Sequence, residues 1–234
     1  MMDLAPILTG IAVAGLICQA TAVPVPFKVE AILPQAEGAP DATMAAQIGK
    51  DMLASLIPYR VLKNGGVTYH LGDKSTPPLQ VWAQEKLTGL TIFKVDPARI
   101  YDGQADLTPS GILKRGDKLS FASSKNETTQ GIYVGMEHSI GETSFPLRLI
   151  RAQFPKLAVP PIGQPCYDSE NRLVGIVLGV SRKGTCHLLP ARAISFLATH
   201  PEAKRVRLGC LLDINSSTPV IEGLINGGPL ARAG

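Results

Sequence analysis

The stretch that decides the fold of this 234-residue chain is Leu173-Val174-Gly175-Ile176-Val177-Leu178-Gly179-Val180, in which every residue is apolar or glycine. Two polar segments typical of turns enclose it, Asp168-Ser169-Glu170-Asn171 and Ser181-Arg182-Lys183-Gly184. A short apolar run between turn signals, rich in valine and isoleucine, indicates a buried strand. We therefore expect this stretch to lie in the interior of a sheet.

Further strands are predicted on its N-terminal side, at intervals of roughly ten residues. Apolar and polar residues alternate, as strands require, at residues 27–32, 67–71, 90–95 and 118–122. Spacing of this kind is typical of a sandwich or a barrel. Residues 191–199, which end before Pro201, form the one short helix that the pattern supports. Residues 44–57 fit either a helix or two strands around a turn at residues 49–51, and periodicity alone does not decide between them.

The composition favours a globular all-β domain. The chain has 23 glycines and 19 prolines, with 45% apolar and 18% charged residues. Such frequent glycine and proline argue against a bundle of long helices, and the apolar content excludes wholesale disorder. The net charge is +4, and its densest basic group, residues 204–207, is interpreted as a solvated linker. Scattered cations and a single tryptophan do not match a nucleic-acid-binding surface, so we expect no nucleic-acid partner.

The first 22 residues are predicted to be a cleaved export signal. An apolar run at residues 7–17 is followed by Ala20-Thr21-Ala22, which is an A-x-A cleavage pattern. One feature departs from the usual signal, because no lysine or arginine precedes the run. The run is too short to span a bilayer as a stable helix, so we expect no stable membrane span. Export to the periplasm or the extracellular space follows, with a retained anchor or a cytosolic start as alternatives.

The cysteines do not point to a metal site. Removal of the export signal takes away Cys18 and leaves Cys166, Cys186 and Cys210, an odd number whose pairing the sequence does not determine. No pair has zinc-ligand spacing, and the sequence holds no phosphate-cradling or cofactor motif, so we expect neither metal nor cofactor. We interpret Cys166 as a small buried apolar residue. His70, on an alternating strand, is interpreted as a residue of the surface or rim.

Four stretches, in this order, resemble segments of the HtrA/Deg-type trypsin-like serine proteases. Residues 48–62, 89–96, 113–119 and 160–176 resemble the family's LTNxHVL, DLALLKVD, LKVGDxV and GNSGGPL with GxVIGI. Each motif alone is weak, and their order and spacing together carry the resemblance. It implies an all-β, trypsin-like double β-barrel with one short C-terminal helix, and it favours strands over a helix for residues 44–57.

The resemblance also implies the division of the chain into parts. We expect an export signal at residues 1–22, an inactive trypsin-like domain of the HtrA type at 23–203, and a PDZ-like segment at 204–234. In this last segment, residues 205–209 and 227–234 resemble the RGxLG and GSPAxxAG of a PDZ domain, of which it is the incomplete start. A PDZ domain adds a peptide as a strand to a sheet edge. The resemblance implies that this peptide binding occurs at Leu208, Gly209, Cys210 and Leu211. It also implies that the chain forms homo-oligomers, for which it indicates no particular residues.

The same alignment leaves the catalytic positions of a serine protease without suitable side chains. Such an enzyme needs a hydroxyl nucleophile, an imidazole base and a carboxylate that orients the base, and the corresponding residues are Ile162, Arg60 and Gly89. Isoleucine has no nucleophilic atom, arginine stays protonated, and glycine has no side chain. Pro160 stands at an oxyanion-hole position and has no N–H to donate. We therefore predict no catalytic residues and no enzyme activity.

Two functions remain open at this point. The first is an exported, non-catalytic HtrA/Deg-like pseudoprotease that binds or scaffolds a protein or peptide partner. The second is an active serine-type endopeptidase with an unrecognised active site, for which Ser110 and Ser139 are the nearest imitations of a nucleophile. The chain contains no Gly-x-Ser-Gly or Gly-x-Cys-Gly, which favours the first function. If the alignment holds, Arg60, Gly89 and Ile162 converge on one cleft between two barrels.

Overall fold

The structure is a computed structural model, and it describes residues 23–33, 41–63, 66–72, 75–85, 88–100, 113–124, 127–140, 146–156, 158–181, 184–202, 210–212 and 221–224. The expected export signal and most of the expected PDZ-like segment lie outside these residues. In chain order the elements are β1 (Phe27–Ile32), β2 (Asp41–Gln47), β3 (Met52–Leu56), α1 (Tyr59–Leu62), β4 (Thr68–Leu71), β5 (Gln80–Gln84), β6 (Leu90–Lys94), the 3-10 helix η1 (Pro97–Arg99), β7 (Lys118–Ser124), β8 (Glu127–Ile140), β9 (Pro146–Gln153), β10 (Pro165–Tyr167), β11 (Leu173–Val180), β12 (Thr185–Pro190), α2 (Ala191–Thr199), β13 (Cys210–Leu212) and β14 (Ile221–Leu224).

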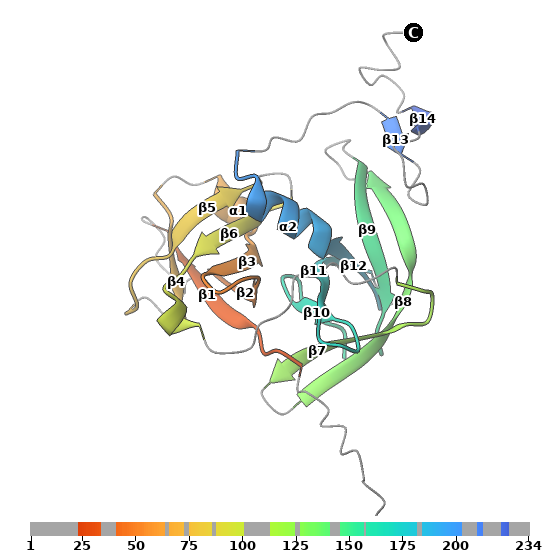
Figure 1. The fold of residues 1–234 in the computed structure, drawn as a ribbon, viewed down its shortest axis with the longest axis horizontal. Coiled ribbons are helices and arrows are strands. Elements are labelled where there is room, and N and C mark those ends of the chain that lie inside the picture. Colours follow the sequence, from red (N-terminus) through yellow and green to blue (C-terminus); the bar gives the residue numbers. More distant parts are fainter. Residues whose placement is uncertain are drawn as a thin grey trace, which may run out of the picture.

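Two six-stranded antiparallel sheets form the body, one at the left and one at the right of Figure 1. The left sheet has the order β4-β1-β2-β3-β6-β5, and the right one closes into a barrel of order β10-β11-β12-β9-β8-β7. The ends of the left sheet approach each other where His70 forms a bridge with Pro78, which makes this sheet a half-barrel. The predicted all-β architecture of two barrels is confirmed, with one barrel fully closed.

The predicted strands and helix agree closely with the observed ones. β11 begins and ends at the predicted residues, and Leu173 to Val177 are buried between β10 and β12. The ambiguous segment at residues 44–57 forms strands, because Ile48 N donates to Met52 O over 3.0 Å and closes the turn between β2 and β3. α2 also has the predicted bounds. Local sequence patterns therefore predicted β1, β4, β6, β7, β11 and α2.

The single helical turn α1 is one of several elements, with β5, β8, β9 and η1, that the sequence analysis did not predict. Its first hydrogen bond runs from Val61 N to Pro58 O over 2.9 Å, and it contains only four residues. A helix of one turn shows no 3.6-residue repeat of apolar residues, so periodicity cannot predict it. Its consequence is positional, because Arg60 lies on this turn rather than on a strand.

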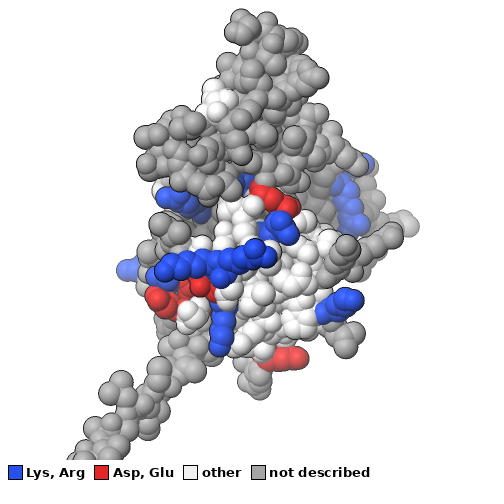
Figure 2. All heavy atoms as spheres, turned by 90° about the vertical axis from the view of Figure 1, so that its right-hand side faces the viewer, with Lys and Arg blue, Asp and Glu red and all other residues white. Residues whose placement is uncertain are grey.

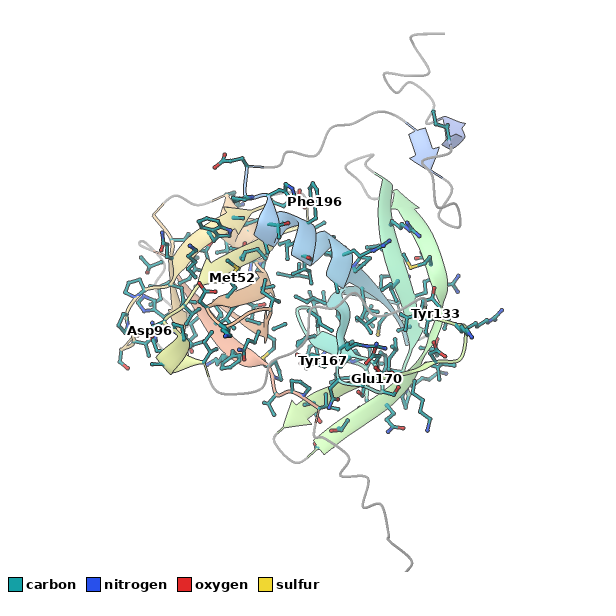
Figure 3. All side chains as sticks on the ribbon, viewed as in Figure 1. Met52, Asp96, Tyr133, Tyr167, Glu170 and Phe196 are labelled. Atoms are coloured by element: carbon teal, nitrogen blue, oxygen red, sulfur yellow. The ribbon has the colours of Figure 1, made fainter. Side chains whose placement is uncertain are left out.

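A shared apolar core joins the two sheets. It combines residues of the first sheet, such as Leu56 and Ile92, with residues of the barrel and of α2, such as Tyr167 and Ile194. Figure 3 shows Tyr167 on β10, at the side of the barrel that faces the first sheet, and Phe196 on the outer side of α2. Since burial of apolar surface is the main stabilising contribution, this core holds the two sheets together.

The position of His70 corrects the prediction that it lies at the surface or rim. His70 is only 7% exposed, and its Nδ1 lies 2.7 Å from the carbonyl oxygen of Thr76. The segment at residues 75–78 returns over β4, and the bridge to Pro78 keeps it there. His70 therefore has a structural role, which strand alternation alone could not show because the covering segment follows later in the chain.

Charged residues on the outer face of the barrel compensate one another. Figure 2 shows basic and acidic side chains interspersed over the β8 and β9 side of the molecule. The Glu137 carboxylate has two partners, since it lies 3.3 Å from Arg151 Nε and 2.7 Å from His187 Nε2. Glu137 and Arg151 lie on the neighbouring strands β8 and β9 and support the sheet as cross-strand contacts do, whereas His187 reaches Glu137 from β12, on the other side of β9.

β13 and β14 pair antiparallel and form a separate two-stranded sheet.

Over the residue ranges given above, no helix is long and apolar enough to cross a membrane.

The closed barrel contains two thiols, which leads to a first prediction. Cys166 and Cys186 are free and fully buried, and burial raises the pKa of both, that of Cys186 to about 11. Because the thiolate is the reactive form, iodoacetamide at about pH 8 should modify neither cysteine in the folded protein and both after unfolding in guanidinium. Peptide mapping by mass spectrometry resolves each site. Rapid alkylation of either cysteine in the folded protein would contradict this packing.

Candidate functional site

The three aligned catalytic positions lie in three different elements. Arg60 is exposed on α1, and Gly89 is buried directly before β6. Ile162 lies in the turn that precedes β10, and 62% of it is exposed, the largest fraction among the large apolar residues that the structure describes. The structure therefore places two of the three side-chain positions toward solvent and one in the interior.

Thr43 on β2 brings these elements to one junction between the sheets. Its hydroxyl donates to Leu56 O over 3.0 Å, at the end of β3 and shortly before α1. The same hydroxyl oxygen lies 2.8 Å from the position of a Cβ built on Gly163, the residue after Ile162. Ile57 N in turn donates to Gly89 O over 2.8 Å. The segments that carry Arg60, Gly89 and Ile162 are thus linked by direct contacts.

At Gly89 the backbone itself fills the space that a side chain needs. The residue has a φ of +78°, and a Cβ placed there would lie 2.2 Å from the carbonyl oxygen of Ile57. Its own N–H donates to Glu85 O over 3.0 Å, which fixes this conformation. A carboxylate cannot occupy this position without displacing the chain at Ile57. The local backbone therefore has no room for a side chain at this position.

The turn at residues 160–164 uses its amide groups for its own structure. Gln164 N donates to Pro161 O over 3.1 Å, and Gly163 N donates to Val177 O on β11 over 2.8 Å. Gly163 has a φ of +88° at the third position of this turn, where glycine is favoured. Pro160 has no N–H. An oxyanion hole needs two amide donors aimed at one point, and Pro160, which aligns with one of the two donor positions, has none.

Buried hydroxyl groups surround the junction, and the sequence analysis did not single them out. Ser55 and Thr91 are fully buried register partners on β3 and β6. Ser55 Oγ donates to Met44 O over 2.7 Å, and Thr91 Oγ1 donates to Gly89 O over 3.2 Å. Each hydroxyl thus satisfies a backbone carbonyl and has a structural role. Ser55 and Thr91 lie together because β3 pairs with β6, and this pairing joins residues far apart in the sequence.

The remaining candidates do not form a catalytic pair in the described residues. Cys186 points into the barrel and His187 points out of it, where it contacts Glu137, so these two adjacent residues do not face each other as a base and a nucleophile would. Ser110 lies outside the described residues, as does the side chain of Ser139 on β8. Where side chains are described, His, Cys, Asp and Glu form no group of three or more that could hold a metal ion.

The residues expected to bind a peptide in the PDZ-like segment are partly described. Leu208 and Gly209 lie outside the described residues. Cys210 and Leu211 open β13, where they pair with Leu224 and Gly223 of β14. This backbone pairing leaves their expected role in peptide binding as a prediction.

Comparisons with known proteins agree with this architecture. No protein-family model matches the chain, and no curated protein matches it. Among solved structures, the Rv3671c protease of M. tuberculosis in its active form is similar, with a TM-score of 0.57, 16% identity and coverage of 78% of this chain and 83% of that one. The HtrA-type protease AlgW with a tripeptide has a TM-score of 0.59 at 16% identity, over 90% of this chain and 76% of that one. The fold is that of a trypsin-like, HtrA-type protease.

The close approach at Gly89 gives a second prediction. Substitution of Gly89 by alanine should lower the free energy of unfolding by about 3–4 kcal/mol, because the new Cβ collides with the Ile57 carbonyl in a left-handed conformation. Gly116 is the matched control, since its φ is +96° and a Cβ there would have no atom within 4 Å. Gly116→Ala should cost about 1–2 kcal/mol, from the left-handed conformation alone.

Urea unfolding of the two variants measures this difference. Equal destabilisation by the two substitutions would show that the space at Gly89 is open. In that case the backbone would not exclude a carboxylate from this position.

Proposed function

We propose that this chain is an exported, non-catalytic protein of the HtrA/Deg type that binds a protein or peptide partner. One observation carries the proposal. At the junction where the fold assembles a base and a nucleophile, the exposed side chains are those of Arg60 and Ile162, and backbone fills the position of the carboxylate at Gly89.

At the aligned catalytic positions, this chain lacks the chemical groups that peptide hydrolysis requires. The nucleophile must lose a proton to a base, and neither Ile162 nor Arg60 exchanges a proton near neutral pH. The tetrahedral intermediate needs two amide donors, and Pro160, at one of the two aligned donor positions, has none. The groups that would bind a substrate are not lost in the same way, which supports binding without cleavage.

An open edge of β11 supports peptide binding. Pairing between β10 and β11 ends at Pro165 with Ile176, whereas pairing between β11 and β12 continues to Val180 with Cys186. Within the described residues, Leu178 to Val180 therefore have a sheet neighbour on one side. An extended peptide can pair with such an edge through its main chain. Val180 is 40% exposed and offers an apolar contact beside it.

Export, a PDZ-like peptide site at residues 204–234 and homo-oligomer formation complete the proposal. They are supported by the leader-like residues 1–22 and by the resemblance of residues 205–209 and 227–234 to a PDZ domain. The hairpin of β13 and β14 lies within that segment. Each part is tested independently of the barrel domain.

A third prediction concerns activity. The unmodified protein should not hydrolyse β-casein, and a variant with Arg60→His and Ile162→Ser together should stay at background. These substitutions restore a base and a nucleophile, but they leave Gly89 and Pro160 unchanged. Loss of a single oxyanion donor alone costs about a hundredfold or more in rate. Hydrolysis by the unmodified protein that a serine-protease inhibitor blocks would instead establish an active endopeptidase.

A fourth prediction concerns binding at β11. A fluorescent peptide of alternating valine and threonine should bind the protein, because its main chain can pair with the open edge at Leu178 to Val180. The same peptide with alternate N-methylated amides should bind at least about tenfold more weakly, since it loses main-chain donors while it keeps its side chains. Fluorescence anisotropy measures both. Equal affinity for the two peptides would exclude strand addition.

A further inference from the structure

Two exposed cations follow one another at the junction. Arg60 lies on α1 and Lys63 directly follows its last residue, and both are exposed. Residues 56–63 contain no aspartate or glutamate. A guanidinium has five N–H donors, so Arg60 can accept an additional anionic partner beside any contact it already makes. This corner of the first sheet is therefore complementary to negative charge.

The turn of the barrel that meets this corner is apolar and also lacks acidic residues. Pro161 and Ile162 are exposed, and two consecutive prolines restrict the backbone before Ile162. No aspartate or glutamate occurs in residues 154–166. The hydrogen bond from Gln164 N to Pro161 O, together with that from Gly163 N to β11, fixes the turn. Ile162 is thus held in place as an exposed apolar contact.

The two surfaces are neighbours through Thr43. Its hydroxyl bonds to Leu56 O, four residues before Arg60, and contacts Gly163, one residue after Ile162. Ile162 also lies beside β11, because Gly163 N donates to Val177 O. Ile162 therefore lies between the open end of β11 and the segment that leads from β3 into α1.

We infer that the partner segment is acidic. This inference rests on the proposed function and deepens it: an extended peptide pairs with β11, places an apolar side chain on Ile162, and directs aspartate or glutamate side chains to Arg60 and Lys63. Carboxylates match the planar fork of a guanidinium, and the opposing surface adds no competing acid from residues 56–63 or 154–166. The acidic side chains, rather than a terminal carboxylate, are the chemistry that this surface recognises.

Matched peptides test the inference. The probe is the fluorescent valine–threonine peptide extended at either end by two glutamates, and its control has two glutamines instead. We expect the glutamate form to bind about tenfold more tightly, with a preference that fades at high salt because the charges are exposed. Both peptides are amidated at the C-terminus, and a third probe has glutamines with a free terminal carboxylate.

Variants identify the site. Arg60→Gln with Lys63→Gln should abolish the preference for glutamate while the glutamine peptide keeps its affinity. Lys50→Gln is the control, since Lys50 is exposed at the opposite end of β3 and carries the same charge. Ile162→Ser should weaken both peptides equally. Circular dichroism of each variant establishes that it is folded.

The outcomes separate this inference from the proposed function. If the two peptides bind equally and the Arg60 and Lys63 variant behaves like the unmodified protein, the inference is wrong and peptide binding stands. If only the free carboxylate raises affinity, the surface recognises chain ends and the inference is also wrong. If no peptide binds, the proposed function is wrong, and the inference that rests on it is wrong as well.

Discussion

The hydroxyl of Thr43 lies where β2, the end of β3 and the 160–164 turn meet, and the arrangement of the junction depends on it. It donates to the carbonyl of Leu56 and packs against Gly163, so it joins the half-barrel to the closed barrel. A glycine is needed at position 163 both for its positive φ and for this contact. This contact brings the turn that carries Ile162 beside the end of β3, which precedes α1.

Around this contact, the chain has the strand arrangement of a trypsin-like, HtrA-type fold. Contacts of Thr43 and Ile57 link the segments that carry residues 60, 89 and 162. At position 89 the main chain leaves no space for a side chain, because the carbonyl oxygen of Ile57 occupies it. Within the described residues, the same framework has an edge open to main-chain pairing at Leu178 to Val180 of β11.

The sequence predicted the elements better than it predicted their contacts. The bounds of β11 and α2 follow from local signals, namely an apolar run between turns and a helix stopped before Pro201. Residues 44–57 needed the resemblance, since their apolar spacing suits both structures. The burial of His70 depends on the segment at residues 75–78, and the neighbourhood of Ser55 and Thr91 depends on the pairing of β3 with β6, which are far apart in the chain. The positions of the candidate site were readable from the sequence, whereas the blocked backbone at Gly89 required coordinates.

Trp82 is the only tryptophan of the chain, and its surroundings give it a further use. Its indole N–H donates to Ala198 O on α2 over 3.0 Å, and the Lys94 ammonium lies 4.0 Å from its ring centroid. The indole thus sits between the half-barrel and the helix, in an environment that exists only while the two are docked. Its emission spectrum reports that docking without any added label. Separation of α2 from β5 would shift the fluorescence even if both barrels stayed folded.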